Sequence, residues 1–131
     1  MTDVMRLPEI ELLSDLIRRP SITPDDAGCQ RVLAKRLQQM GFSCETLQFG
    51  DVTNLWARRG TSSPVLCFAG HTDVVPPGNV SAWQHPPFEP TFVGDCLYGR
   101  GAADMKSGLA AMLVAIERFL EARPDYDGSI A

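Results

Sequence analysis

A short apolar run that ends in polar residues constrains this chain more than any other feature. Residues 65–69 read Val-Leu-Cys-Phe-Ala, with Pro64 before the run and Gly70 after it. An unbroken apolar run of this length is typical of a strand that is buried on both faces, as in the covered sheets of α/β proteins. The run leads directly to His71 and Asp73. Ligands collect beyond the carboxyl ends of strands in open α/β sheets, so these two side chains are candidates for a functional site.

The spacing of His71 and Asp73 fits a metal site. Residues i and i+2 of an extended chain point to the same side, so both side chains would face one pocket. A neutral imidazole is a good zinc ligand, and a nearby carboxylate can hold its other ring N–H and fix the tautomer. Purely structural roles stay open for both residues. His71 can be a hydrogen-bonded structural residue, and Asp73 can cap the following turn.

Composition limits the classes of function. The chain has 131 residues, 44% of them hydrophobic and 21% charged, which predicts one globular domain with a core. The formal net charge of -4 argues against a nucleic-acid partner, which requires a basic face. No apolar stretch has the length of a membrane helix, and no signal peptide is visible before residue 7. We therefore expect a cytoplasmic protein whose partner is a small-molecule substrate, with neither a membrane nor a nucleic acid.

The cysteines do not form a metal or disulfide motif. They stand at positions 29, 44, 67 and 96, and none forms a Cys-x-x-Cys pair. Three of the four lie inside runs with helix or strand patterns. We therefore predict buried free thiols in a reducing compartment.

The order of predicted elements is that of an α/β protein. Apolar periodicity predicts helices over 7–19 and 106–121, and a further helix that follows Asp25 or Asp26 and ends at Gly41. Strands are predicted over 42–49 and 52–58, joined at Gly50-Asp51, together with a hairpin within 91–98. An irregular loop is expected over 76–90, and a further apolar run starts at 129. The helix over 106–121 is apolar on nearly all sides in its first half, so we expect it to be buried against the sheet. His85 lies in the irregular loop, where a structural role is favoured.

A second polar cluster lies before the last predicted helix. Residues 99–108 read Gly-Arg-Gly-Ala-Ala-Asp-Met-Lys-Ser-Gly. A Walker A loop needs glycine where Met105 stands, and a dinucleotide fingerprint needs glycine where Asp104 stands, so a nucleotide site is not expected. Asp104 is either the N-cap of the helix or a carboxylate that bridges metal ions held near His71.

Together the two clusters resemble a known family. Gly-His-Thr-Asp-Val-Val-Pro-Pro-Gly at 70–78 and Gly-Arg-Gly-Ala-Ala-Asp-Met-Lys at 99–106 are similar to the paired motifs of the dinuclear zinc aminoacylases and carboxypeptidases. The resemblance covers essentially the whole chain. Segments 24–30 and 86–91 favour one biosynthetic amide hydrolase of the family over its acetylornithine deacetylase relatives, which stay as an alternative together with the metallo-carboxypeptidases. The implied fold is the N-terminal part of a three-layer α/β/α catalytic domain with a mixed, mostly parallel sheet.

The resemblance also implies roles for individual residues. His71 corresponds to a terminal ligand of one zinc, and Asp104 corresponds to the carboxylate that bridges two zincs. Asp73 corresponds to the catalytic acid that orients the ligating histidine. The family has a cis peptide after the bridging aspartate, which predicts a cis bond between Asp104 and Met105. Two zincs are implied per complete site, and the second position accepts cobalt or other divalent ions.

Several family residues have no counterpart in residues 1–131. The family also needs two adjacent glutamates after the next strand, one more acidic ligand and a second ligating histidine. We therefore expect 1–131 to be the N-terminal portion of a longer homodimeric enzyme, without the rest of the catalytic domain and the dimerisation domain. By itself the chain is expected to bind zinc weakly and to be inactive. A non-catalytic fragment that self-associates is the other possibility. A serine or cysteine hydrolase is disfavoured because no Gly-x-Ser-x-Gly elbow is present.

Overall fold

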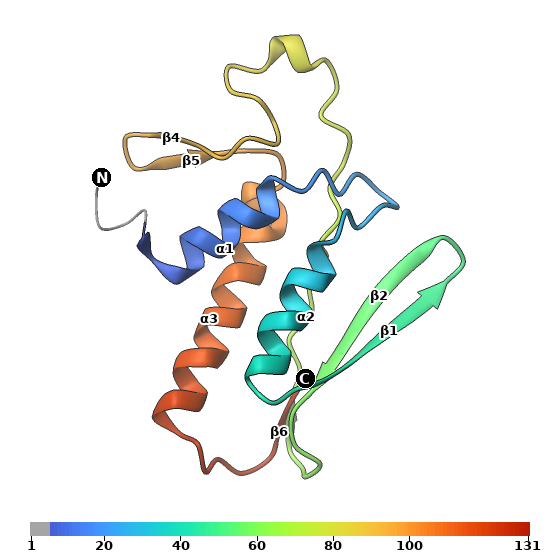
Figure 1. The fold of residues 1–131 in the computed structure, drawn as a ribbon, viewed down its shortest axis with the longest axis vertical. Coiled ribbons are helices and arrows are strands. Elements are labelled where there is room, and N and C mark those ends of the chain that lie inside the picture. The colour runs from blue at the N-terminus through green and yellow to red at the C-terminus, as the bar shows by residue number, and fades with distance from the viewer. Residues whose placement is uncertain (1–5) are drawn as a thin grey trace.

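Three helices supply most of the hydrophobic core in the computed structural model, which describes residues 6–131. They are α1 (Pro8–Ile17), α2 (Cys29–Gln39) and α3 (Ser107–Ala122), and α1 crosses the upper part of α3 (Figure 1). Leu16 and Ile17 of α1 are fully buried where the helices meet. Within the described part of the chain, no helix combines the length and apolarity needed to cross a membrane.

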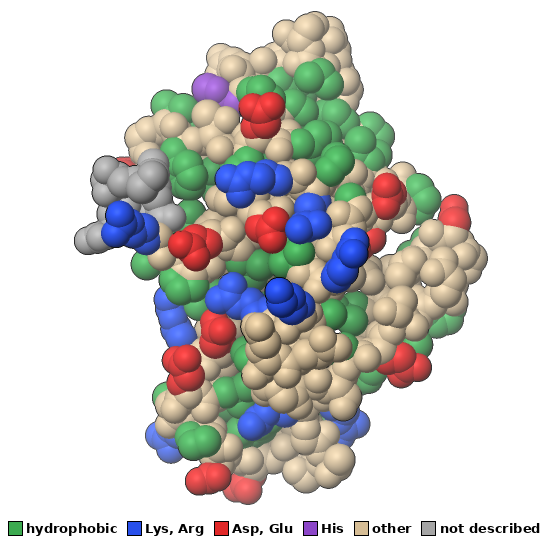
Figure 2. Space-filling view, viewed as in Figure 1, with side chains coloured by type: hydrophobic (Ala, Val, Ile, Leu, Met, Phe, Trp, Pro, Cys, Tyr) green, Lys and Arg blue, Asp and Glu red, His purple; other side chains and the backbone are tan. Residues whose placement is uncertain are grey.

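The surface around these helices has charges of both signs. On the face shown in Figure 2, Lys and Arg side chains are interspersed with Asp and Glu side chains. Arg36 of α2 pairs with Glu117 of α3 at 2.8 Å, and Arg118 of α3 pairs with Glu9 of α1 at 3.1 Å. Partly exposed ion pairs of this kind contribute little to stability, so apolar contacts are the main attraction between the helices.

The helices begin and end close to where the local sequence predicts. Pro8 stands in the first turn of α1, where the missing N–H leaves no hydrogen bond unmade. The N-cap of α2 is Gly28, not Asp25 or Asp26 as predicted, but the Asp26 carboxylate accepts the backbone N–H of Gln30 in the first turn at 2.9 Å. Gly41 has a φ of +85°, the left-handed conformation that glycine adopts easily after a helix.

The strands of residues 6–131 form three separate pairs. β1 (Ser43–Phe49) and β2 (Val52–Arg58) are antiparallel, β4 (Thr91–Val93) and β5 (Cys96–Tyr98) are antiparallel, and β3 (Val65–Leu66) and β6 (Ser129–Ile130) are parallel. The first pair is the predicted hairpin, with Phe49 opposite Val52 across the turn at Gly50-Asp51. Helices together with a parallel strand pair confirm the α/β class.

The central strand differs from its prediction. Only Val65 and Leu66 of the apolar run are in β3, and their exposed fractions are 43% and 60%, so the expectation of burial on both faces is wrong. The reason is the number of neighbouring strands. β6 pairs with the start of the run, whereas the edge at 67–72 borders an open groove. The last helix also differs, because α3 packs chiefly against α1 rather than against a sheet.

The cysteines are free, but they are not all buried. Cys29 is buried under α1, and this burial raises the pKa of its thiol. Cys67 and Cys96 are exposed, which contradicts the prediction of buried thiols. Cys67 lies on the open edge beside the groove, and Cys96 lies in the two-stranded β4–β5 pair.

Candidate metal centre

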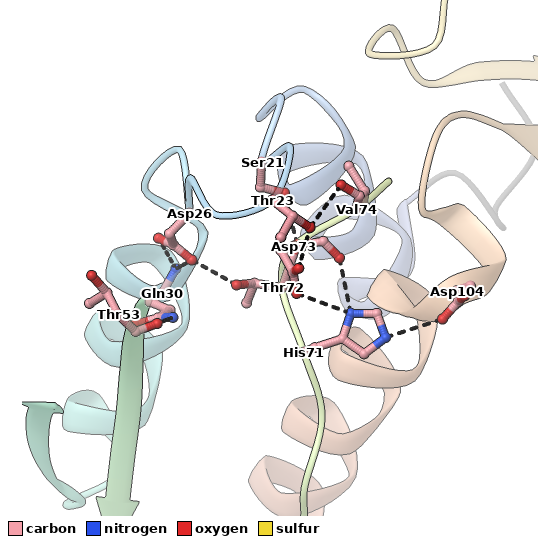
Figure 3. Close-up of polar contacts among 10 residues, drawn as sticks. All are labelled: Ser21, Thr23, Asp26, Gln30, Thr53, His71, Thr72, Asp73, Val74 and Asp104. Carbon is pink, nitrogen blue, oxygen red and sulfur yellow. Dashed lines mark hydrogen bonds and ion pairs between the residues drawn. The ribbon is translucent and has the colours of Figure 1, made fainter. Parts of the chain in front are cut away.

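The structure brings His71 and Asp104 together. Nε2 of His71 lies 3.2 Å from Oδ1 of Asp104, although the two residues are 33 positions apart in the chain. Figure 3 shows His71 at the end of the extended 65–70 segment and Asp104 on the turn that leads into α3. The two clusters singled out in the sequence therefore face one point.

Asp73 holds the other side of the imidazole. Nδ1 of His71 lies 2.9 Å from the backbone oxygen of Asp73 and 3.5 Å from its Oδ1. A carbonyl oxygen only accepts hydrogen bonds, so Nδ1 must carry the proton and donate it. The lone pair of a neutral His71 is then on Nε2. The main chain of Asp73 is the closer partner, a contact that its side-chain type does not predict.

The pair of His71 and Asp104 has the geometry of a cation site. Nε2 of a neutral imidazole and Oδ1 of a carboxylate are both acceptors, and two acceptors 3.2 Å apart repel unless a proton or a metal cation lies between them. Asp104 is 91% exposed and is free to rotate toward such a cation. An imidazole nitrogen and a carboxylate oxygen form a donor set that suits zinc. The residues present therefore fit a metal ion at this place.

Asp104 is not the cap of α3. None of the described side chains caps the first turn of this helix, and Asp104 has the non-helical angles φ −120° and ψ 92°. It lies in the turn η3 (Ala102–Lys106), and the peptide bond to Met105 is cis, as the family resemblance implies. The N-cap alternative is therefore wrong, whereas the role of a bridging ligand stays a prediction.

The turn that carries Asp104 is fixed by two residues. Gly101 has a φ of +76°, and its carbonyl oxygen accepts the backbone N–H of Lys106 at 2.9 Å. Lys106 is fully buried, and its Nζ donates to the carbonyl oxygens of Leu16 at 2.6 Å and Arg19 at 2.9 Å. Burial lowers the pKa of this ammonium group. Sequence reasoning missed this role of Lys106, because a lysine beside a polar turn normally indicates exposure.

The loop between α1 and α2 holds the histidine segment from the other side. Thr23 donates to the Asp73 carboxylate at 2.5 Å, and Thr72 donates to Asp26 at 2.7 Å. A parallel bridge between Ile22 and Val74 adds backbone hydrogen bonds. These contacts were also missed, although the Pro-Asp-Asp sequence of this loop is part of the segment that carries the resemblance.

His85 lies away from this site. Its ring centroid is 5.0 Å from that of Tyr98, and both residues line a separate hollow with Trp83. This position agrees with the structural role favoured from the sequence. Among residues 6–131, no group of three or more His, Cys, Asp and Glu side chains is placed to hold a metal ion. His71 and Asp104 are thus two ligands of a metal site that needs further ligands.

Comparison with known proteins identifies the family. Residues 67–131, which include both polar clusters, match the model of Peptidase family M20/M25/M40. Succinyl-diaminopimelate desuccinylase of Psychromonas ingrahamii is 60% identical over 124 residues, which are 95% of this chain and 33% of that protein. The protein of the same name from Shewanella pealeana is 59% identical over 131 residues, which are 100% of this chain and 34% of that protein. This chain belongs to peptidase family M20/M25/M40.

Solved structures share the fold of this M20 chain. Human carnosine dipeptidase 1 is 25% identical and superimposes with a TM-score of 0.81 over 98% of this chain and 31% of that one. A metallo-carboxypeptidase of the M20 family from Sulfolobus solfataricus is 24% identical, with a TM-score of 0.83 over 93% of this chain and 29% of that one. The chain spans about a third of the length of the curated relatives it matches.

Proposed function

We propose that this M20 chain is the N-terminal portion of the catalytic domain of a zinc-dependent amide hydrolase, succinyl-diaminopimelate desuccinylase. The reaction is hydrolysis of N-succinyl-L,L-diaminopimelate to succinate and L,L-diaminopimelate. The observation that carries the proposal is the pair of acceptor atoms on His71 and Asp104, 3.2 Å apart, in a family of peptidases. The substrate is proposed from the relatives of about 60% identity that have this name.

Three residues of the chain have roles in this proposal. His71 would hold a zinc ion through Nε2, and Asp104 would supply its carboxylate as a ligand shared by two zinc ions. Asp73 holds the Nδ1–H of His71, which keeps the lone pair on Nε2. When bound, the ions supply Lewis acidity that activates water and polarises the amide carbonyl. The general base and the remaining ligands are proposed to come from the part of the relatives that this chain does not span.

The cellular setting belongs to the same proposal. A desuccinylase of this kind acts in the cytoplasm, in the synthesis of diaminopimelate and lysine, as a homodimer. The second metal position is proposed to accept cobalt or other divalent ions as well as zinc. The acidic net charge of -4 fits a small-molecule substrate and disfavours a nucleic-acid partner.

A chimera tests the reaction directly. This chain would replace the matching 34% of the Shewanella pealeana desuccinylase, and the purified chimera would be assayed with succinyl-diaminopimelate and acetylornithine side by side. We expect hydrolysis of the first substrate to be much faster. A folded chimera that prefers acetylornithine favours the deacetylase alternative. One that cleaves only dipeptides favours a peptidase, the activity in the name of carnosine dipeptidase 1.

In the active chimera, Asp104→Asn and His71→Ala are expected to reduce kcat by about a thousandfold or more, because each removes a metal donor. Zinc content measured by mass spectrometry should fall together with kcat. His85→Ala is the matched control, since His85 lies in the separate hollow beside Tyr98. Unchanged zinc content and activity in Asp104→Asn would contradict the proposed bridging role.

The isolated chain is expected to bind zinc weakly. Catalytic zinc sites use three protein ligands and structural sites use four, whereas the described residues bring together one imidazole and one shared carboxylate. Calorimetric titration of the purified chain should give a dissociation constant of about 10 μM or weaker. Metal analysis that finds nearly two tightly held zinc ions per chain would refute this expectation.

A further inference from the structure

The Asp73 carboxylate has a different partner on each of its oxygen atoms. Oδ1 lies 3.5 Å from Nδ1 of His71, and Oδ2 accepts the hydroxyl of Thr23 at 2.5 Å. Thr23 is 50 positions earlier in the chain, in the loop between α1 and α2. In Figure 3, Asp73 lies between Thr23 and His71. The three side chains therefore form one row from the loop to the candidate metal ligand.

Little else restrains this carboxylate. The Asp73 side chain is 40% exposed, and within residues 6–131 its two oxygens have no further hydrogen-bond or ion-pair partner. An exposed side chain changes rotamer within picoseconds to nanoseconds, and the terminal torsion of a carboxylate has broad minima. His71 does not hold it firmly, because Nδ1 is closer to the main-chain oxygen of Asp73, at 2.9 Å. The Thr23 hydroxyl is thus the contact that selects one orientation of the carboxylate.

Main-chain hydrogen bonds place the Thr23 hydroxyl. The N–H of Thr23 donates to the carbonyl oxygen of Val74 at 3.1 Å, and the N–H of Val74 donates to the carbonyl oxygen of Ser21 at 2.8 Å. Oγ1 of Thr23 also lies 3.3 Å from the Val74 oxygen, but a hydroxyl has a single proton, so the closer carboxylate takes it. Thr23 is exposed and has no part in the core. Its geometry fits a residue that acts on Asp73 rather than on packing.

We propose that Thr23 is a positioning residue for the hydrolysis and acts through Asp73. Its hydroxyl keeps Oδ1 of Asp73 toward Nδ1 of His71, so that the imidazole keeps its orientation and its lone pair on Nε2. This inference rests on the proposed function. Outer-shell partners of metal-binding histidines change activity by about 10–100-fold, and Thr23 is one contact further out, so we expect the lower end of that range.

Variants of the chimera with the Shewanella pealeana desuccinylase test this role. Thr23→Val keeps the shape of the side chain without its hydroxyl, and Thr23→Ser keeps the hydroxyl. Thr72→Val is the matched control, because the Thr72 hydroxyl also joins the histidine segment to the loop, but its hydrogen bond goes to Asp26. We expect kcat to fall about tenfold in Thr23→Val, with KM changed by less than about twofold. In Thr23→Ser and Thr72→Val, kcat should stay within about threefold of the parent value.

A second readout needs neither a metal ion nor activity. Couplings from the backbone nitrogen and carbonyl carbon of Asp73 to its Cγ, measured by NMR in the isotope-labelled chain, report whether the side chain holds one rotamer. The parent chain, Thr23→Ser and Thr72→Val should give the couplings of one rotamer, whereas Thr23→Val should give averaged couplings. If the chain alone gives no spectrum of a folded protein, the same couplings are measured in the chimera.

The two readouts separate this inference from the proposed function. A folded chimera that is inactive on every substrate contradicts the proposed function, and the couplings then decide the role of Thr23. Unchanged couplings in Thr23→Val overturn the inference. An active chimera in which Thr23→Val keeps the parent kcat also overturns it. Equal losses of kcat in Thr23→Val and Thr72→Val do the same, because they assign the effect to the attachment of the loop.

Discussion

Replacing Gly101 with alanine is expected to cost about 3 kcal/mol or more of unfolding free energy, against about 1 kcal/mol for Gly78→Ala. The φ angles of the two glycines are +76° and +72°, so the added Cβ strains both main chains equally. They differ in the space around them. A Cβ on Gly101 would overlap Cγ1 of Val74, whereas no atom of the described residues lies within 4 Å of a Cβ on Gly78.

Urea unfolding of the two variants beside the parent chain measures this difference. The strain common to both positions cancels in the comparison, and the remainder is the cost of moving Val74 away from the turn. Val74 is buried and bridges to Ile22, so it has little room to move. Equal losses in Gly101→Ala and Gly78→Ala would show that the turn does not pack against the histidine segment in this way.

Lys106→Ala is expected to lower the unfolding free energy by about 3 kcal/mol. The substitution leaves a cavity where the lysine stem was buried, and it leaves the carbonyl oxygens of Leu16 and Arg19 without their donor. The variant no longer bears the desolvation cost of a buried ammonium group, and this gain offsets part of the loss. Lys106→Met keeps most of the volume and loses only the donor, so its expected cost is smaller, about 1–2 kcal/mol.

Thermal and urea unfolding of the two Lys106 variants separate packing from hydrogen bonding. Lys35→Met is the matched control, because this lysine is exposed on α2 and its replacement is expected to leave the unfolding free energy nearly unchanged. If Lys106→Met is as stable as the parent chain, the two carbonyl contacts contribute nothing net. If Lys106→Ala is also unchanged, Lys106 is not buried in solution.

The elements that local signals define were predictable from the sequence. α1 and α2 follow from apolar periodicity, Pro8 and Gly41, and the β1–β2 hairpin follows from the turn at Gly50-Asp51. The meeting of His71 and Asp104 was also expected, because the two clusters resemble the paired motifs of the family. These features depend on neighbours in the chain or on the family resemblance.

The features that could not be predicted from the sequence depend on contacts between distant segments. The run at 65–69 has the composition of a buried strand, but composition does not say whether strands lie on both sides of it. The burial of Lys106 depends on free carbonyl oxygens at the end of α1, 90 positions earlier. The bonds from Thr23 to Asp73 and from Thr72 to Asp26 span about fifty positions and leave no periodic signal in the sequence.

The packing of the first helix on the last has a consequence for synthesis on the ribosome. α1 is made early, yet its main partner is α3, and the contact from Lys106 to Leu16 closes a loop of 90 residues. At about 5–20 residues per second, α1 waits roughly 5–20 s for that partner. During this interval Leu16 and Ile17, which end fully buried, face solvent or a chaperone. The nascent chain is therefore most prone to aggregate before α3 has emerged.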